Sequence, residues 1–126
     1  MPEPSSINPA VRRSERGAIL VEFAILFPVM ILLIIGGIDI GLAMVEANRL
    51  NFAVEAGARC QAIKASPCPT PDATVTYASS AAGLPGAAFA VSAAPCGVQV
   101  DGSYTYASFI LPNIPLNATA CYPSSL

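Results

Sequence analysis

The sequence predicts an α+β fold, in which a long N-terminal transmembrane and amphipathic helix precedes a small, disulfide-stabilised, antiparallel β head. Residues 18–38 form an apolar run of membrane-crossing length, interrupted by one acid, Glu22. Beyond this run, apolar residues recur at helical spacing. Short β-branched segments separated by Gly and Pro follow, and all four cysteines lie on that C-terminal side.

Residues 1–17 are predicted to be a cytoplasmic leader. The first ten are rich in proline and serine, which is typical of irregular chain. Arg12, Arg13 and Arg16 precede the apolar run and almost no positive charge follows it, so the positive-inside rule places the N-terminus in the cytoplasm. Everything after the run is then exported.

The long helix is predicted over residues 18–64. Residues 18–38 match the ~20 residues that a bilayer-spanning helix needs and exceed the core of a cleaved secretory signal. Pro28 predicts a kink within this span. Asp39 is expected to mark the water interface, and residues 39–63 are expected to form an amphipathic extension. Its apolar face comprises Ala43, Ala47, Leu50 and Val54, while Glu46, Asn48, Arg49, Asn51 and Glu55 are expected to face mostly away.

Residues 65–126 are predicted to form the β-rich head, after a break that holds three prolines within residues 65–71. Alternation and β-branched content predict strands over residues 73–77, 87–93, 98–106 and 114–120, with the last two paired antiparallel. A bulge or a tight turn is expected at Asp101–Gly102.

Cysteine spacing favours disulfides over a metal site. Four cysteines allow three pairings, of which Cys60 with Cys68 and Cys96 with Cys121 are favoured, because the first joins the helix end to the following loop and the second flanks the last two strands. The alternative pairings stay open. An exported compartment permits disulfides, and the spacing from Cys60 to Cys68 does not fit zinc.

Composition argues against several functional classes. The chain has no histidine, no Gly-x-Ser-x-Gly motif and no argued carboxylate pair, so we expect no enzyme, cofactor, metal or small-molecule substrate. The net charge is -2 and the exported part is mildly acidic, so nucleic-acid binding is not expected.

Glu22 is the most informative residue for function. An acidic side chain costs roughly 3 kcal/mol at the centre of a membrane helix and less near its ends. A helix that serves only as an anchor is not expected to retain such a residue. We therefore expect Glu22 and its neighbours to be recognised, either by a processing enzyme or by a neighbouring copy of a similar helix.

The stretch from Glu15 to Pro28, ERGAILVEFAILFP, resembles the TadE-like family, the minor pilins or pseudopilins of tight-adherence (Tad/Flp) pilus systems, which carry the class III leader of type IV pilin-like proteins. Residues 38–41, residues 55–59 and the closing segments after residue 98 are also similar to that family. The resemblance covers about residues 12–122.

This resemblance implies cleavage between Gly17 and Ala18 by a membrane prepilin peptidase. Ala18 would become the new amino terminus, and Glu22 would be the family's acid at the fifth position. In pilin-like assemblies this acid pairs with the amino terminus of an adjacent subunit and sets the axial register. An intrachain contact between Ala18 and Glu22, or simple snorkelling of Glu22, is the alternative.

The expected function is therefore that of a minor pilin-like subunit, processed and then assembled into, or needed to assemble, a Tad-type pilus for surface adherence. Its expected partners are the membrane, the prepilin peptidase and other pilin-like subunits. It would reside in a bacterial cytoplasmic membrane, and at the cell surface after assembly. The alternative is an uncleaved, membrane-anchored protein whose exported head binds an envelope or extracellular partner.

Overall fold

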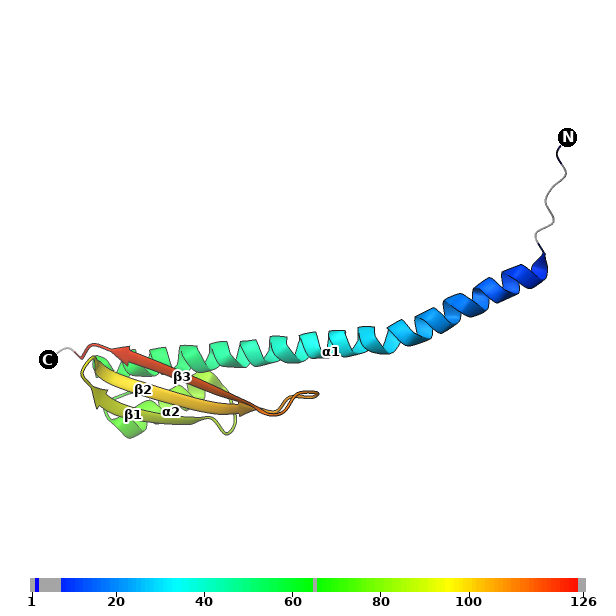
Figure 1. Ribbon diagram of the computed structural model, residues 1–126. Helices are drawn as coiled ribbons and strands as arrows, with labels where there is room; N and C mark the ends of the chain where they lie inside the picture. The colour runs from blue at the N-terminus through cyan, green and yellow to red at the C-terminus, as the bar shows by residue number, and fades with distance from the viewer. Residues whose placement is uncertain (1, 3–7, 65, 125–126) are drawn as a thin grey trace. The chain divides into compact units, whose positions relative to one another are not determined.

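The computed structural model describes residues 2, 8–64 and 66–124, without the side chains of residues 10–14. Most of the expected irregular leader, and the side chains of Arg12 and Arg13, lie outside the described residues. The described elements are two helices and three strands (Figure 1): α1 Pro9–Ala62, α2 Pro71–Ala82, β1 Ala88–Ala94, β2 Gly97–Tyr106 and β3 Ile114–Tyr122. The predicted α+β class, with its long N-terminal helix and small antiparallel sheet, is confirmed.

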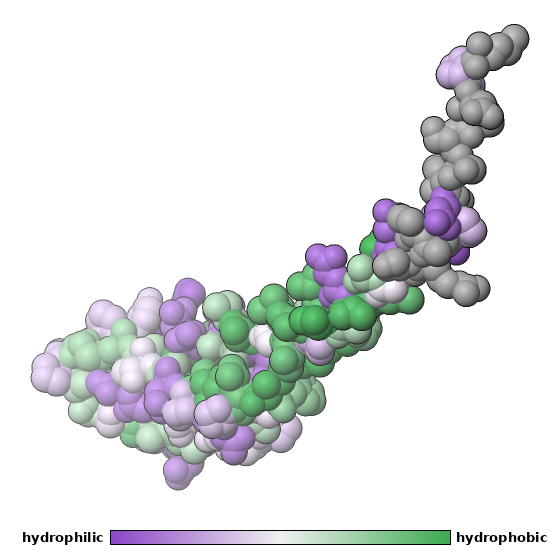
Figure 2. Space-filling view, turned by 45° about the vertical axis from the view of Figure 1, so that its right-hand side comes forward, coloured by the Kyte–Doolittle hydropathy of each residue, from purple (hydrophilic) through white to green (hydrophobic). Residues whose placement is uncertain are grey.

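The chain forms two compact units, residues 1–37 and residues 38–126. In the first unit, every residue from 15 to 35 is exposed. Figure 2 shows hydrophobic side chains gathered along this helical segment. By length and composition, α1 contains a segment that could cross a membrane.

Helix α1 begins nine residues before the predicted start at Ala18. Pro9 suits the first helical position, because its fixed φ is helical and its missing N–H would have no partner there. The following residues contain no helix breaker, and Gly17 costs only about 1 kcal/mol inside a helix. Pro28 lies within the helix, which continues through it. The kink there stays a prediction.

In the second unit, α1 ends at Ala62, one residue from the expected end. Lys64 adopts a left-handed φ of 48° that stops the helix. The amides of Ile63 and Lys64 donate to the carbonyls of Arg59 and Gln61, at 3.2 and 3.1 Å. The predicted apolar face is buried at Ala43, Leu50 and Val54, and half-buried at Ala47.

Residues 71–82 form α2, so the strand predicted over residues 73–77 is wrong. Thr70 caps the helix by accepting a hydrogen bond from the Ala73 amide at 3.3 Å, and Pro71 occupies its start. Gly83, at a left-handed φ of 61°, closes the helix with its amide on the Ser79 carbonyl. The helix-stabilising effect of these caps exceeds the preference of the β-branched residues between them for a strand.

The other three predicted strands are confirmed to within two residues at each end. They form an antiparallel sheet in the order β1-β2-β3, and β2 pairs with β3 from Val98↔Tyr122 to Tyr106↔Ile114. The pairing runs without interruption through Asp101↔Thr119 and Gly102↔Ala118, so the expected bulge or turn is absent from this sheet.

Gly102 instead allows the sheet to approach α1 closely. A Cβ atom at this position would lie 2.9 Å from Cγ1 of Val54 and 3.1 Å from Cδ1 of Leu50. Gly57 marks a second junction, where a Cβ would contact Ala78 of α2 and Val100 of β2 at 3.4 and 3.8 Å. The second unit is therefore organised around the C-terminal part of α1, with α2 and the inner face of the sheet packed on it. The buried core comprises Leu50, Ala53, Val54, Ala58, Ala82, Leu84, Val100 and Ala118.

Candidate functional site

The junction predicted from the sequence lies on an open stretch of α1. Gly17, Ala18 and Glu22 are all exposed, and a Cβ at Gly17 would meet no atom within 4 Å among the described residues, apart from the helix's own adjacent backbone. Ala18 and Glu22 are four residues apart, so they lie on the same side of the helix one turn apart. Glu22 makes no ion pair with any side chain that the structure describes. The exposed carboxylate is thus accessible to a group from outside the unit.

A second acid, Asp39, forms a site that the sequence did not predict. Its side chain is 0% exposed and accepts hydrogen bonds from the Tyr106 hydroxyl at 2.9 Å and from the Ser108 hydroxyl. The amides of Phe109 and Ile110 also donate to it, at 3.2 and 3.4 Å. Asp39 therefore clasps the loop between β2 and β3, residues 107–113, to the helix.

Asp39 is buried by these partners, and the expectation that it marks the water interface stays a prediction. Its partners lie 67 to 71 residues further along the chain, so no local pattern reveals them. A lone acid after an apolar run fits an exposed interface residue equally well from the sequence alone. These hydrogen bonds depend on the tertiary packing of the loop against the helix.

The hydrogen bonds to Asp39 perturb titration around the clasp. The Ser108 hydroxyl chiefly, with Tyr106 and the two amides, holds the pKa of Asp39 below its ordinary value of 3.8, against the opposing effect of burial. Burial, and then the neighbouring Asp39 carboxylate, raise the pKa of Tyr106 above 10.0. Both effects favour an ionised acid beneath a neutral phenol.

Of the five polar residues expected to face mostly away, Asn48, Arg49, Asn51 and Glu55 are exposed, and the fifth is Glu46. The residue is half-buried, and its Oε2 atom is buried with no hydrogen-bond partner among the described residues. It lies near Tyr104, whose pKa is raised by burial first and by Glu46 second. The helix face toward the sheet therefore carries two acids, Asp39 and Glu46, beside two tyrosines.

Two disulfides fasten the second unit, and they are the pairings favoured from the sequence. Cys60 bonds to Cys68 with a Cα–Cα distance of 5.7 Å and ties the end of α1 to the segment before α2. Cys96 bonds to Cys121 with a Cα–Cα distance of 6.2 Å and ties the β1–β2 turn to the end of β3. The described residues contain no group of acids and cysteines that could hold a metal ion.

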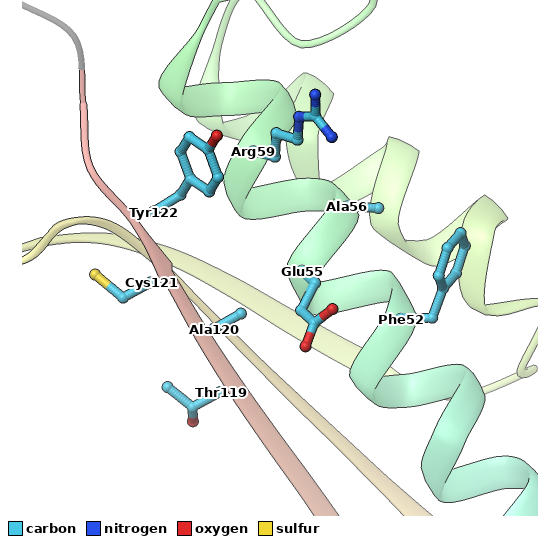
Figure 3. Close-up of a pocket in the computed structure, with 8 residues that line it drawn as sticks. All are labelled: Phe52, Glu55, Ala56, Arg59, Thr119, Ala120, Cys121 and Tyr122. Carbon is cyan, nitrogen blue, oxygen red and sulfur yellow. The ribbon is translucent and has the colours of Figure 1, made fainter.

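An open groove of about 610 Å³ runs between α1 and the end of β3 (Figure 3). Its lining includes one acid, Glu55, and one base, Arg59, both on α1, beside two aromatic rings. One acid and one base at the wall of an open groove suit a contact surface. The residues that line it are Phe52, Glu55, Ala56, Arg59, Thr119, Ala120, Cys121 and Tyr122.

An exposed apolar helix that could cross a membrane, followed in the sequence by a small disulfide-bonded sheet, suggests a membrane-anchored class of protein. The TadE-like protein family matches residues 17–59. These residues are therefore TadE-like, as the sequence resemblance indicated, and the match begins at Gly17 and includes Glu22 and Asp39. No curated protein and no solved structure matches the chain significantly.

The family suggests a pilin-like protein associated with Tad pili, in a structural and non-enzymatic class. The match ends at Arg59, before the second helix and the sheet. The match therefore covers only α1, and the properties of the sheet and of α2 are inferred from their own contacts.

Proposed function

We propose that this chain is a minor pilin-like subunit of a Tad-type pilus, processed by a prepilin peptidase and then inserted into, or required for, pilus assembly. The observation that carries the proposal is the TadE-like match, whose first residue is Gly17, directly before the proposed cut. In this proposal, residues 1–17 are the leader, and residues 18–38 cross the cytoplasmic membrane with the head exported.

The local structure supports processing at Gly17–Ala18. The bond lies within α1, so a protease that binds an extended substrate must first unwind the helix there. Glycine lowers helix stability by about 1 kcal/mol relative to alanine and makes this unwinding easier. The absence of any contact within 4 Å of a Cβ at Gly17 leaves the junction open to an enzyme.

Assembly is proposed to use Glu22. Cleavage creates an ammonium group at Ala18, and both this group and the exposed Glu22 carboxylate are unfavourable in lipid. Pairing Glu22 with the Ala18 ammonium of an adjacent subunit would neutralise both charges. A subunit in the wrong register would leave both unpaired, so the pair selects the axial register.

The processing step is tested by co-expressing the full chain with and without a prepilin peptidase and sequencing the N-terminus of the membrane-bound product. We expect Ala18 as the first residue only when the peptidase is present. Gly17→Leu should block the cut. Gly36→Leu is the matched control, because a Cβ there also meets no atom within 4 Å, and it should be cut normally. A chain that stays full length beside an active peptidase would remove the pilin-like proposal.

The assembly step is tested with Glu22→Ala, which should leave membrane insertion and cleavage intact and abolish incorporation into pili. Glu15→Ala removes the same charge from an exposed position in the leader and is the matched control. Because the leader is absent from the processed subunit, Glu15→Ala should assemble normally once cleaved. Normal pilus incorporation of the Glu22→Ala protein would refute the register role.

The alternative function is an uncleaved anchored protein whose head binds an envelope or extracellular partner. The groove between α1 and β3 favours it, because Phe52 and Tyr122 offer 62% and 39% exposed aromatic surface there. The same N-terminal sequencing separates the two functions. Only the pilin-like subunit loses residues 1–17.

A further inference from the structure

The loop between β2 and β3, residues 107–113, exposes three consecutive large apolar side chains. Phe109 is 76% exposed, and Ile110 and Leu111 are each 45% exposed. The loop carries no charged residue. Surface loops facing water usually consist of polar and turn-forming residues. An uncharged loop with an apolar tip would therefore be more stable in an apolar environment than in water.

The clasp on Asp39 places this tip at a defined level of α1. Asp39 accepts from the amides of Phe109 and Ile110, and it directly follows the apolar run of residues 18–38. With a rise of about 1.5 Å per helical residue, Asp39 lies within a few ångströms of the end of that run along the helix axis. The loop is thus held where the proposed membrane span ends.

The sheet packs on a later part of α1 than the loop does. Gly102 of β2 packs against Leu50 and Val54, which follow Asp39 by eleven and fifteen residues. This separation corresponds to roughly 16–22 Å along the helix axis. Strand β2 therefore runs along α1 toward Asp39, and the loop follows at the end of that strand. Figure 1 shows the loop, in orange, beyond the end of the sheet and beside α1.

The loop backbone is also prepared for an apolar environment. Irregular backbone is costly in lipid, because its amides and carbonyls lose water as a hydrogen-bond partner. In this loop, the amides of Phe109 and Ile110 donate to Asp39, and the amide of Leu111 donates to the Ser108 hydroxyl at 2.9 Å. The three residues with exposed apolar side chains are thus the three whose amides are satisfied within the protein.

We propose that the β2–β3 loop docks onto the exported face of the same bilayer that α1 crosses, with Phe109, Ile110 and Leu111 entering the boundary between headgroups and acyl chains. Exposed Ile38 and Ile40 flank the clasp on α1 and extend the apolar surface. Docking at this second point fixes how the head sits over the membrane before assembly. The inference rests on the membrane anchoring in the proposed function, and requires neither cleavage nor pilus assembly.

The test uses the absence of tryptophan from the chain. Phe109→Trp introduces a single tryptophan, which can be excited selectively, into the full-length protein. The protein is reconstituted in phosphatidylcholine vesicles whose acyl chains carry bromine close to the headgroups. Phe23→Trp, in the apolar run, reports membrane insertion of α1. Phe52→Trp, at another exposed phenylalanine about 20 Å beyond Asp39 on the same helix, reports a position in water.

We expect the Phe109→Trp protein to show blue-shifted emission and a loss of intensity in brominated vesicles comparable to that of the Phe23→Trp protein. The Phe52→Trp protein should keep its intensity. Water-like, unquenched emission from Phe109→Trp beside a quenched Phe23→Trp protein would overturn the docking inference alone. Blue-shifted emission without quenching by lipid would mean that a protein surface, such as a second copy, covers the loop, and would also overturn it. An unquenched Phe23→Trp protein would overturn the anchoring as well.

Discussion

Replacing Gly102 by alanine tests how closely α1 and the sheet are fitted. Gly102 is buried in the middle of β2, and the added methyl group would lie 2.9 Å from Cε1 of Phe89, 2.9 Å from Cγ1 of Val54 and 3.1 Å from Cδ1 of Leu50. Carbon atoms pack best at about 3.5–4.0 Å. Leu50 and Val54 are each only 1% exposed, so neither side chain can move into solvent.

Overpacking of this kind costs about 1–3 kcal/mol. Alanine recovers roughly 0.5–1 kcal/mol, because glycine is the less favourable residue in a strand interior. From the midpoints of these two ranges, the net loss in the free energy of unfolding should be about 1 kcal/mol. For a unit the size of residues 38–126, each kcal/mol lowers the Tm by about 4–8 °C.

Gly57→Ala is the matched control for the same change of side chain. A Cβ at Gly57 would lie no closer than 3.4 Å to a neighbouring atom, Cβ of Ala78, which is an ordinary contact distance. Alanine also gains about 1 kcal/mol over glycine in a helix interior. We therefore expect Gly57→Ala to unfold at the Tm of the original protein or above it.

The assay is thermal unfolding of the full-length protein in detergent micelles, followed by near-ultraviolet circular dichroism of the tyrosines and phenylalanines in the head. The expected order is Gly102→Ala lowest, and Gly57→Ala equal to or above the unsubstituted chain. A Gly102→Ala protein as stable as the unsubstituted chain would refute the close approach of β2 to α1. An equal decrease in Tm for Gly102→Ala and Gly57→Ala would refute the inference that the close approach is located at Gly102.

Two further predictions concern the disulfides and the clasp. Replacing Cys96 and Cys121 together by serine should lower the free energy of unfolding by about 3.5 kcal/mol, and replacing Cys60 and Cys68 should lower it by about 2.5 kcal/mol. The difference follows from the loop entropy of separations of 25 and 8 residues. Denaturant unfolding midpoints of the two variants in the reverse order would contradict this reasoning. Because folding lowers the pKa of Asp39, its stabilisation is fully present above the ordinary value of 3.8 and is lost as the pH falls through the lower folded-state pKa. Amide exchange in the loop, corrected for intrinsic rates, should therefore accelerate in that acidic range, and unchanged protection there would contradict the clasp.

Most of the fold could be predicted because its signals are local. The apolar run defines the exposed part of α1, and the buried positions Leu50 and Val54 follow from helical spacing alone. Strand β2 was predicted almost to the residue, since Val98, Val100 and Tyr106 share one face of a strand by their spacing, and Val100 and Tyr106 are buried. Each of these patterns depends on a few neighbouring residues, so tertiary contacts did not need to be known.

Helix α2 was missed because two local signals conflict within it. Thr74, Val75 and Thr76 favour a strand, whereas Thr70 and Gly83 mark the two ends of a helix. The helix prevails because its caps are satisfied, and because Thr74 is buried against α1. Its hydroxyl lies within hydrogen-bonding distance of the Gln61 side chain and of the Thr70 carbonyl. The cap residues were visible in the sequence. The burial of Thr74, which depends on the packing of two helices, was not.

Two acids, Glu22 within the apolar run and Asp39 directly after it, cannot be told apart in function from the sequence alone. By residue type and position, Glu22 and Asp39 both suggest costly charges near a membrane boundary. The structure separates them, because Asp39 has four partners within its own unit, whereas Glu22 has no ion-pair partner among the described residues. An acid whose hydrogen bonds are satisfied within one chain can act there, as the anchor of the β2–β3 loop. The proposed role of Glu22 involves a second subunit, so it has to be tested in an assembly, whereas that of Asp39 can be tested in a single chain.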